Sequence, residues 1–379
     1  MSMSNGEPLL DIEELELTYE DETAVMEAIP ESVKARFDWT SQPIRAVDGV
    51  SLEIDENDVV AVIGESGSGK TSFGKTVIGL QEPTGGSIRY RGYDIWELKR
   101  RNVLDDMEYS DFRKGMQIVH QDAGAALNPY QTILTILKEP LILWYPELDH
   151  ADYHERVLEM LRVCGLTPAM EYVDRYPHEL SGGEQQRIAL VRAMLVEPDL
   201  ILADEPVSAL DPSLRIDLMD LMLELQDMFN TSFLFITHNL EAARYITLKA
   251  DGEIAIMYLG EIVERGPADE VLENPQHPYT QVLKWATLHS HPDVARELLE
   301  EEPPLRDLEA PDVTNVPSGC RFHTRCPKAK NACVEDAPDH LDNGDPSHTA
   351  ACHRLDPNHP YWDSEWLDDE GEIEIVDRF

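Results

Sequence analysis

Short apolar segments recur along the chain, and each has the pattern of a strand. From Val50 to Ile54 apolar and polar residues alternate, as in a strand with one buried face. Val59 to Ile63 is wholly apolar and mostly β-branched, which is typical of a parallel strand buried on both faces. Strand and helix patterns then alternate, and this predicts an α/β fold with a parallel sheet. These later elements are strands at 200–203 and 233–237 and helices at 212–228 and 240–247.

The pattern also divides the chain into regions. Residues from about 122 to 190 are mainly helical, and Cys164 falls on the apolar face of one of these helices, as an ordinary core residue does. After Gly266 prolines become frequent and the periodicity fades. We therefore predict a first domain of residues 1–265, with a helical subdomain at about 122–190, and an irregular extension of residues 266–379. The polar stretch between Tyr19 and Pro43 is interpreted as an insertion between two early strands.

Charge narrows the possible partners. The 379 residues include 74 Asp and Glu but only 31 Lys and Arg, a net charge of −43. A surface this acidic repels nucleic acid and anionic lipid, so we expect no nucleic-acid partner. Acidic residues run through the whole chain, which argues against a single acidic tail. With only ten Lys, the composition resembles that of proteins from extreme halophiles.

Two kinds of location are also excluded by pattern. No stretch approaches the roughly 20 apolar residues that a membrane helix needs. The first ten residues have neither the basic nor the apolar part of a signal peptide. We therefore expect neither an integral membrane protein nor a secreted one.

One glycine-rich segment has a specific chemical meaning. It matches the phosphate-loop pattern in full, follows the strand at Val59 to Ile63, and is followed by a helical run. Such a loop turns its backbone N–H groups toward phosphate oxygens at a helix N-terminus, whereas a chance match would lack these flanks. Lys70 is expected to reach the terminal phosphates, and the Thr71 hydroxyl to bind Mg²⁺. The segment is Gly64-Glu65-Ser66-Gly67-Ser68-Gly69-Lys70-Thr71.

A pair of acids completes the expected nucleotide site. Asp204 and Glu205 follow the apolar strand at 200–203, so both lie at the carboxyl edge of the predicted sheet. We predict that Asp204 binds Mg²⁺ and that Glu205 polarises the water that attacks the γ-phosphate.

A third segment resembles a known family. Leu180-Ser181-Gly182-Gly183-Glu184-Gln185-Gln186-Arg187 resembles the signature sequence of ABC-type ATPases, and it offers a second anion-binding helix N-terminus. Three further residues fall where this family has its other motifs. Gln121 resembles the Q-loop glutamine, Asp211 ends a segment that resembles the D-loop, and His238 resembles the switch histidine.

The resemblance implies how ATP and Mg²⁺ are bound. Glu205, His238 and Gln121 would be catalytic, with Thr71, Asp204 and Gln121 around Mg²⁺. Tyr19 is the first choice to stack on adenine, with Phe37 and Trp39 as rivals. The implied ATP contacts are Tyr19, Gly64, Glu65, Ser66, Gly67, Ser68, Gly69, Lys70, Thr71, Ser72, Gln121, Ser181, Gly182, Gly183, Asp204 and Asp211.

The resemblance covers about residues 8 to 290 and can be narrowed. The segments at 277–283 and 319–327 and the pair Asn128-Pro129 are similar to those of oligopeptide/dipeptide importer ATPases. This implies a P-loop ABC ATPase fold with a parallel sheet core, an antiparallel β subdomain and a helical subdomain. Segment 122–127 departs from the usual proline and serines, which leaves the partner and the transported solute open.

Partners and location follow from the same resemblance. It implies a second ATPase subunit, identical or homologous, and two membrane permease subunits. An extracellular solute-binding protein would act indirectly. The chain would be peripheral, at the cytoplasmic face of the membrane. The alternatives are a soluble ABC ATPase without a transporter and a redox regulator.

Four cysteines lie close together in the extension, whereas the first 319 residues hold one. A local thiol cluster in a chain without an export signal is typical of a metal site. The wide spacing favours [4Fe–4S] over tetrahedral Zn²⁺, and the resemblance implies the same; zinc and unliganded thiols remain alternatives. The expected ligands are Cys320, Cys326, Cys333 and Cys352.

Overall fold

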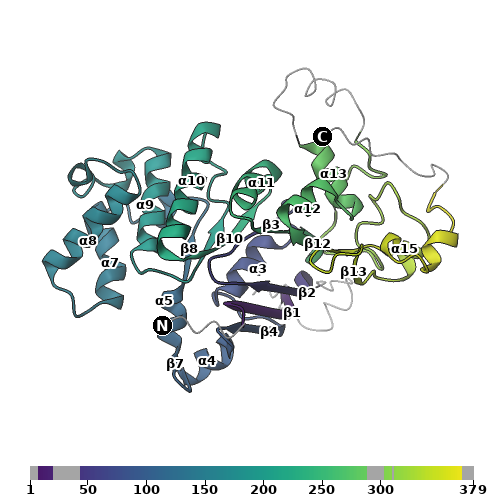
Figure 1. Ribbon diagram of the computed structural model, residues 1–379, viewed down its shortest axis with the longest axis horizontal. Coiled ribbons are helices and arrows are strands. Elements are labelled where there is room, and N and C mark those ends of the chain that lie inside the picture. Colours follow the sequence, from purple (N-terminus) through teal and green to yellow (C-terminus); the bar gives the residue numbers. More distant parts are fainter. Residues whose placement is uncertain (1–6, 20–42, 288–302, 310, 369–379) are drawn as a thin grey trace, which may run out of the picture.

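A computed structural model describes residues 7–19, 43–287, 303–309 and 311–368. Its centre is an eight-stranded sheet with the order β13-β14-β12-β11-β3-β10-β9-β8, crossed by helices on both sides (Figure 1). The strands from β11 to β8 are parallel, and the last three at the other edge are antiparallel. The bounds are β3 Val59–Ile63, β8 Met116–Val119, β9 Leu200–Asp204, β10 Ser232–Thr237, β11 Glu253–Tyr258, β12 Glu261–Pro267, β13 His340–Asp342 and β14 Thr349–Ala351.

The alternation of side chains along β3 explains why the sheet is covered on both faces. Val59, Ala61 and Ile63 belong to one hydrophobic core, and Val60 and Val62 belong to another. A strand that is apolar at every position is stable only where both faces are buried, as the sequence predicts.

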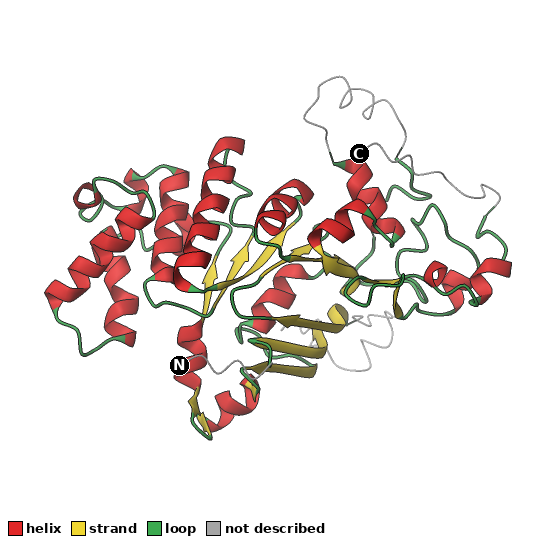
Figure 2. Ribbon diagram, in the orientation of Figure 1, coloured by secondary structure: helices red, strands yellow, loops and turns green. Residues whose placement is uncertain are grey.

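A second, antiparallel sheet closes one of these cores. Its order is β2-β1-β4-β5, and helix α3 packs with it against the main sheet (Figure 2). A two-stranded ribbon, β6 with β7, comes after β5 in the sequence. The bounds are β1 Leu10–Tyr19, β2 Ile44–Ile54, β4 Gly85–Tyr90, β5 Tyr93–Asp94, β6 Val103–Leu104 and β7 Met107–Glu108.

Helices build the other core and a separate lobe. In Figure 1, α7, α8 and α9 form the lobe at the far end from the C-terminal region. Helices α7 and α8 lie within the range predicted for a helical subdomain, about 122–190, and α9 runs past it to Met194. None of the helices in the described ranges has the length and apolar composition to cross a bilayer. The bounds are α3 Lys70–Val77, α4 Ile95–Arg101, α5 Tyr109–Gly115, α6 Ala123–Ala126, α7 Ile133–Trp144, α8 His150–Val163, α9 Gly182–Met194, α10 Pro212–Phe229, α11 Leu240–Lys249, α12 Ala268–Glu273, α13 Pro278–Ala286 and α15 Ala332–Glu335.

The extension is less irregular than its sequence indicates. Helices α12 and α13 follow directly after β12, and β13 with β14 pairs with β12 and so continues the main sheet. The expectation that regular structure ends near Gly266 is therefore wrong. The division of the chain between residues 265 and 266 remains a prediction, and that point lies inside β12.

Most predicted elements of the core are confirmed. The strands expected at 59–63, 200–203 and 233–237 correspond to β3, β9 and β10, and the helix expected at 212–228 is α10. Cys164 ends α8 with no exposed surface, and burial raises its pKa to about 12, as expected for a core thiol. The predicted insertion after Tyr19 lies outside the described residues.

Candidate nucleotide site

The phosphate loop connects β3 to α3 and needs glycine at two points. Gly69 caps α3 with a φ of 104°, a conformation that side chains with a Cβ rarely adopt. A Cβ on Gly64 would lie 2.1 Å from the backbone oxygen of Met257, so no other residue fits there without a shift of the backbone. Both glycines therefore let the loop pass close to neighbouring strands before the helix begins.

Lys70 is the buried cation of this loop. Its Nζ donates to the carbonyl oxygens of Gly64 and Glu65, each at 2.8 Å, and lies 3.3 Å from the Ser68 hydroxyl. Burial lowers its pKa, while Glu205 and other nearby carboxylates oppose this shift. The loop thus holds one ammonium group inside a ring of its own oxygens, where an anion can bind it.

Thr71 and Asp204 meet across the end of the sheet. The Thr71 hydroxyl donates to Asp204 Oδ1 at 3.2 Å, and Asp204 is almost fully buried at the end of β9. Burial raises the pKa of Asp204, and the hydrogen bond from Thr71 lowers it. A hydroxyl next to a buried carboxylate is the oxygen donor set that Mg²⁺ prefers, so these two residues fit the expected metal.

Glu205 is the centre of the next group. Its Oε1 lies 2.8 Å from His238 Nδ1, and its Oε2 accepts a bond from Gln121 Nε2 at 3.4 Å. Its φ of 50° is in the left-handed region, and its N–H donates to Ile236 O at 2.9 Å. This conformation is strained for a residue with a Cβ and fixes the direction in which the Glu205 side chain leaves the strand end. The structure therefore brings together the three residues predicted to be catalytic.

Lys70, Thr71 and Glu205 line a cavity of about 440 Å³. Tyr19 is on its wall, with its hydroxyl 3.1 Å from Ser72 Oγ, while Phe37 and Trp39 lie outside the described residues. Two lining residues, Val313 and Val316, come from the extension and were not predicted, because isolated valines in a proline-rich stretch give no signal. The lining residues are Tyr19, Ile44, Arg45, Ala46, Ser66, Gly67, Gly69, Lys70, Thr71, Ser72, Glu205, Leu259, Gly260, Val313 and Val316.

The signature segment lies elsewhere. Ser181 caps α9: its hydroxyl accepts from Glu184 N–H at 3.3 Å, and its own N–H donates to Glu184 Oε2 at 2.8 Å. Gly182 begins the helix and has open space where a side chain would be. Among the described residues that line the cavity, none belongs to this segment, nor is Asp211 among them. The contacts of Ser181, Gly182, Gly183 and Asp211 with nucleotide therefore stay a prediction.

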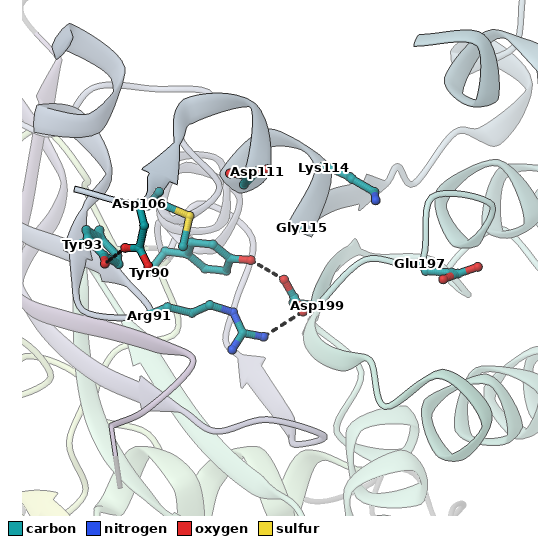
Figure 3. Close-up of a pocket in the computed structure, with 10 residues that line it drawn as sticks. Tyr90, Arg91, Tyr93, Asp106, Asp111, Lys114, Gly115, Glu197 and Asp199 are labelled. Carbon is teal, nitrogen blue, oxygen red and sulfur yellow. Dashed lines mark hydrogen bonds and ion pairs between the residues drawn. The ribbon is translucent and has the colours of Figure 1, made fainter. Parts of the chain in front are cut away.

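A second cavity, of about 480 Å³, lies between the antiparallel sheet and the loop before β9. Figure 3 shows Tyr90 and Arg91 both pointing at Asp199, and Arg91 Nη2 donates to Asp199 Oδ1 at 2.9 Å. Tyr93 in turn donates to Asp106. The bonds of Tyr90 and Arg91 connect the antiparallel sheet to Asp199, the residue that precedes β9. They therefore stabilise the start of the strand that carries Asp204.

The four cysteines of the extension are near one another. Burial raises the pKa of Cys320, and the neighbouring thiols of Cys326, Cys352 and Cys333 raise it further. Cys326, Cys333 and Cys352 are buried. In the described part of the chain, however, no three His, Cys, Asp or Glu side chains are arranged so that they could hold a metal ion. The donor set suits a metal, but the predicted four-ligand geometry is not present.

Comparison with known proteins agrees with this site. A family model described as "ABC transporter" matches residues 47–208, and one described as "Oligopeptide/dipeptide transporter, C-terminal region" matches residues 263–333. The dipeptide transport ATP-binding protein DppF of Haemophilus influenzae is 40% identical over 316 residues, which cover 83% of this chain and 90% of that protein. The chain belongs to the oligopeptide/dipeptide family of ABC transporter ATP-binding subunits. It is therefore an ATPase.

Other relatives of the ATPase subunit give the same result. The oligopeptide transport ATP-binding protein AppF of Bacillus subtilis is 41% identical over 311 residues, or 82% of this chain and 89% of that protein. Among solved structures, a dimeric post-hydrolysis state of the ATP-binding cassette MJ0796, bound to ADP and Pi, matches with a TM-score of 0.54 and 27% identity. It covers 68% of this chain and 98% of that one. These similarities favour a transport ATPase over a non-transport ABC ATPase or a redox regulator.

Proposed function

We propose that the cavity bounded by Lys70, Thr71 and Glu205 binds ATP and that the chain hydrolyses it there. The observation that carries this is the convergence of Lys70, Thr71–Asp204 and Glu205–His238 at the ends of β3, β9 and β10. Lys70 would bind the terminal phosphates, and the ring of Tyr19 would pack against the base. Measuring the ATP affinity of the purified chain and of Lys70→Ala tests the assignment.

Glu205, His238 and Gln121 would position the attacking water. Glu205 would accept a hydrogen bond from the attacking water and orient it, and a bonded His238 would keep that carboxylate in place. Gln121 donates to the other carboxylate oxygen of Glu205, so Gln121 would also help to keep this carboxylate in place. Mg²⁺, held by Thr71 and Asp204, would neutralise charge on the phosphate oxygens.

We propose that the signature segment binds the nucleotide of another subunit. Ser181 and Gly182 lie at an exposed helix N-terminus that does not reach the cavity of their own chain. Such a terminus favours an anion. The dimeric solved structure of a similar cassette supports two subunits that face each other. The second subunit would be identical or homologous.

We infer that the subunit powers import of peptides through two membrane permease subunits, with a solute-binding protein acting outside. The names of the relatives support peptide as the transported solute. Such a subunit would attach peripherally at the cytoplasmic face, near Gln121 and the helical lobe. Vesicles containing the permeases should take up labelled dipeptide only with this chain and ATP present.

We propose a [4Fe–4S] cluster at Cys320, Cys326, Cys333 and Cys352, with Zn²⁺ as the alternative. Burial of the thiols and their closeness to one another support it. His323 and His353 bond backbone oxygens of Cys320 and Asp336 and would only flank the site.

Elemental analysis of anaerobically purified chain tests the cluster. We expect iron and sulfide, lost in Cys326→Ser and retained in Cys164→Ser, because Cys164 ends helix α8 and is not one of the four predicted ligands. One equivalent of zinc without iron would overturn the cluster, and absence of both metals would overturn the site.

A further inference from the structure

The turn between Cys320 and Cys326 contacts the phosphate loop directly. Arg325 Nη1 donates to both carboxylate oxygens of Glu65, at 3.1 and 3.0 Å. The carbonyl oxygen of Glu65 in turn accepts the bond from Lys70 Nζ at 2.8 Å. A continuous path of bonds therefore runs from the extension, through one residue of the loop, to the cation that would bind phosphate.

Glu65 is also held through its backbone. Its N–H donates to the hydroxyl of Tyr279 at 3.0 Å, and Tyr279 has no exposed surface. The ring of Tyr279 packs against Tyr258 and Phe322, with centroids 4.6 and 5.3 Å away. Side chain and backbone of Glu65 are thus both fixed by residues after the core of the ATPase fold.

The ion pair between Arg325 and Glu65 affects the charge that ATP would meet at the phosphate loop. A carboxylate beside a phosphate loop repels a triphosphate unless a cation compensates it. The Arg325 side chain is 9% exposed and that of Glu65 34%, so the pair is partly shielded from solvent and salt. With Arg325 in place, Glu65 can orient the loop without adding an uncompensated negative charge.

The same extension forms part of the cavity wall. Val313 and Val316 line the nucleotide cavity, and Val313 Cγ1 lies 3.8 Å from the point where a Cβ on Gly67 would stand. The apolar wall next to the loop is therefore incomplete without residues that follow the range matched by the ABC transporter model, 47–208.

We propose that Arg325 supports ATP binding through Glu65: it compensates the charge of this carboxylate beside the phosphate loop and orients it by bonds to both oxygens, while Val313 and Val316 close the cavity. The inference rests on the nucleotide site proposed above. Residues of the extension would then belong to the ATPase site itself.

A double-mutant cycle on the full chain tests the proposal. By calorimetry with Mg-ATP, Arg325→Gln should weaken binding on the order of tenfold, because Glu65 is left uncompensated near the phosphates. Glu65→Gln should bind at least as well as the parent, and the double variant should return to within about threefold of it. A purely structural role of Arg325 would give no such rescue. Parent-like affinity in Arg325→Gln, or a double variant as weak as Arg325→Gln, would overturn the proposal.

Two controls separate the possible failures. Arg306→Gln removes another buried arginine of the extension, whose bonds to the carbonyl oxygens of Cys326 and Pro327 lie within it, so it should lower the melting temperature but keep ATP affinity. Lys70→Ala must lose binding; if it does not, the nucleotide site itself is wrong. If Lys70→Ala loses binding and Arg325→Gln does not, only the role of Arg325 is wrong.

The conservative variant covers a failure to fold. Should Arg325→Gln not give folded protein by circular dichroism, Arg325→Lys keeps the charge but cannot bind both carboxylate oxygens in the same way. We then expect ATP affinity a few-fold below the parent, and affinity equal to the parent would overturn the proposal.

Discussion

At the scale of single residues, Lys70 is the group whose loss should affect ATP binding most directly. Lys70→Ala removes a buried ammonium that would make charge-assisted bonds to phosphate, each of about 1.5–3 kcal/mol. We expect ATP affinity to fall by about ten- to a hundredfold, measured by calorimetry. Lys249→Ala is the matched control, since that exposed lysine bonds Asp220 and Tyr245, and its affinity should not change. Equal affinities in both variants would contradict the assignment.

The residues of the site differ in how well the sequence reveals them. Lys70 and Thr71 are recognisable because they complete the phosphate-loop pattern that follows the buried strand β3. Asp204 and Glu205 are recognisable because they stand at the carboxyl end of the buried strand β9. Arg325 gives no such signal. Its partner Glu65 is 260 positions away, and nothing in the spacing of charges indicates which arginine meets which carboxylate.

At the scale of elements, the cap of α13 should make stability depend on pH. His277 begins this helix, its Nδ1 accepts from Tyr279 N–H at 3.0 Å, and burial lowers its pKa to about 3. Because the folded pKa lies below the ordinary value near 6.5, the unfolded chain binds the proton first as the pH falls. The contribution of His277 to the free energy of unfolding should therefore be fully present above about pH 6.5. It should decline toward pH 3, by up to about 1.4 kcal/mol per pH unit.

Comparison with His277→Asn isolates that contribution. Asn can accept the same cap bond but does not titrate. The difference in melting temperature between parent and variant should therefore stay constant above about pH 6.5 and change as the pH falls below it. Identical pH profiles for the two proteins between pH 4 and 7 would show that His277 does not carry this dependence.

The sequence predicts the strands correctly where both of their faces are buried. Strands β3, β9 and β10 are apolar throughout because both faces meet a core, and such runs have few other interpretations. Helices α12 and α13 were missed because they are short and flanked by prolines, so the sequence resembles a loop. The three-residue strands β13 and β14 are stabilised by pairing with β12, which no local pattern shows.

At the scale of the whole molecule, the charge of −43 is the dominant property. We propose a halophilic origin, and predict that the melting temperature and ATPase rate rise with KCl up to molar concentration. At 1 M salt the Debye length is about 3 Å, so repulsion between neighbouring carboxylates largely disappears. Sucrose at equal osmolality, which does not screen charge, should stabilise the protein less. A melting temperature that stays constant or falls in KCl would contradict the prediction.

Hydrolysis of ATP through Glu205 at the phosphate-loop cavity is tested by two measurements on Glu205→Gln, the rate of phosphate release and the affinity for ATP. The amide keeps the size of the side chain and leaves Lys70 and Thr71 intact, but it cannot act as the base. With its partner ATPase subunit and Mg-ATP, the variant should release phosphate on the order of a hundredfold more slowly than the parent, while binding ATP with the parent's affinity. Phosphate release close to the parent rate, with ATP bound as tightly, would show that the reaction does not depend on Glu205.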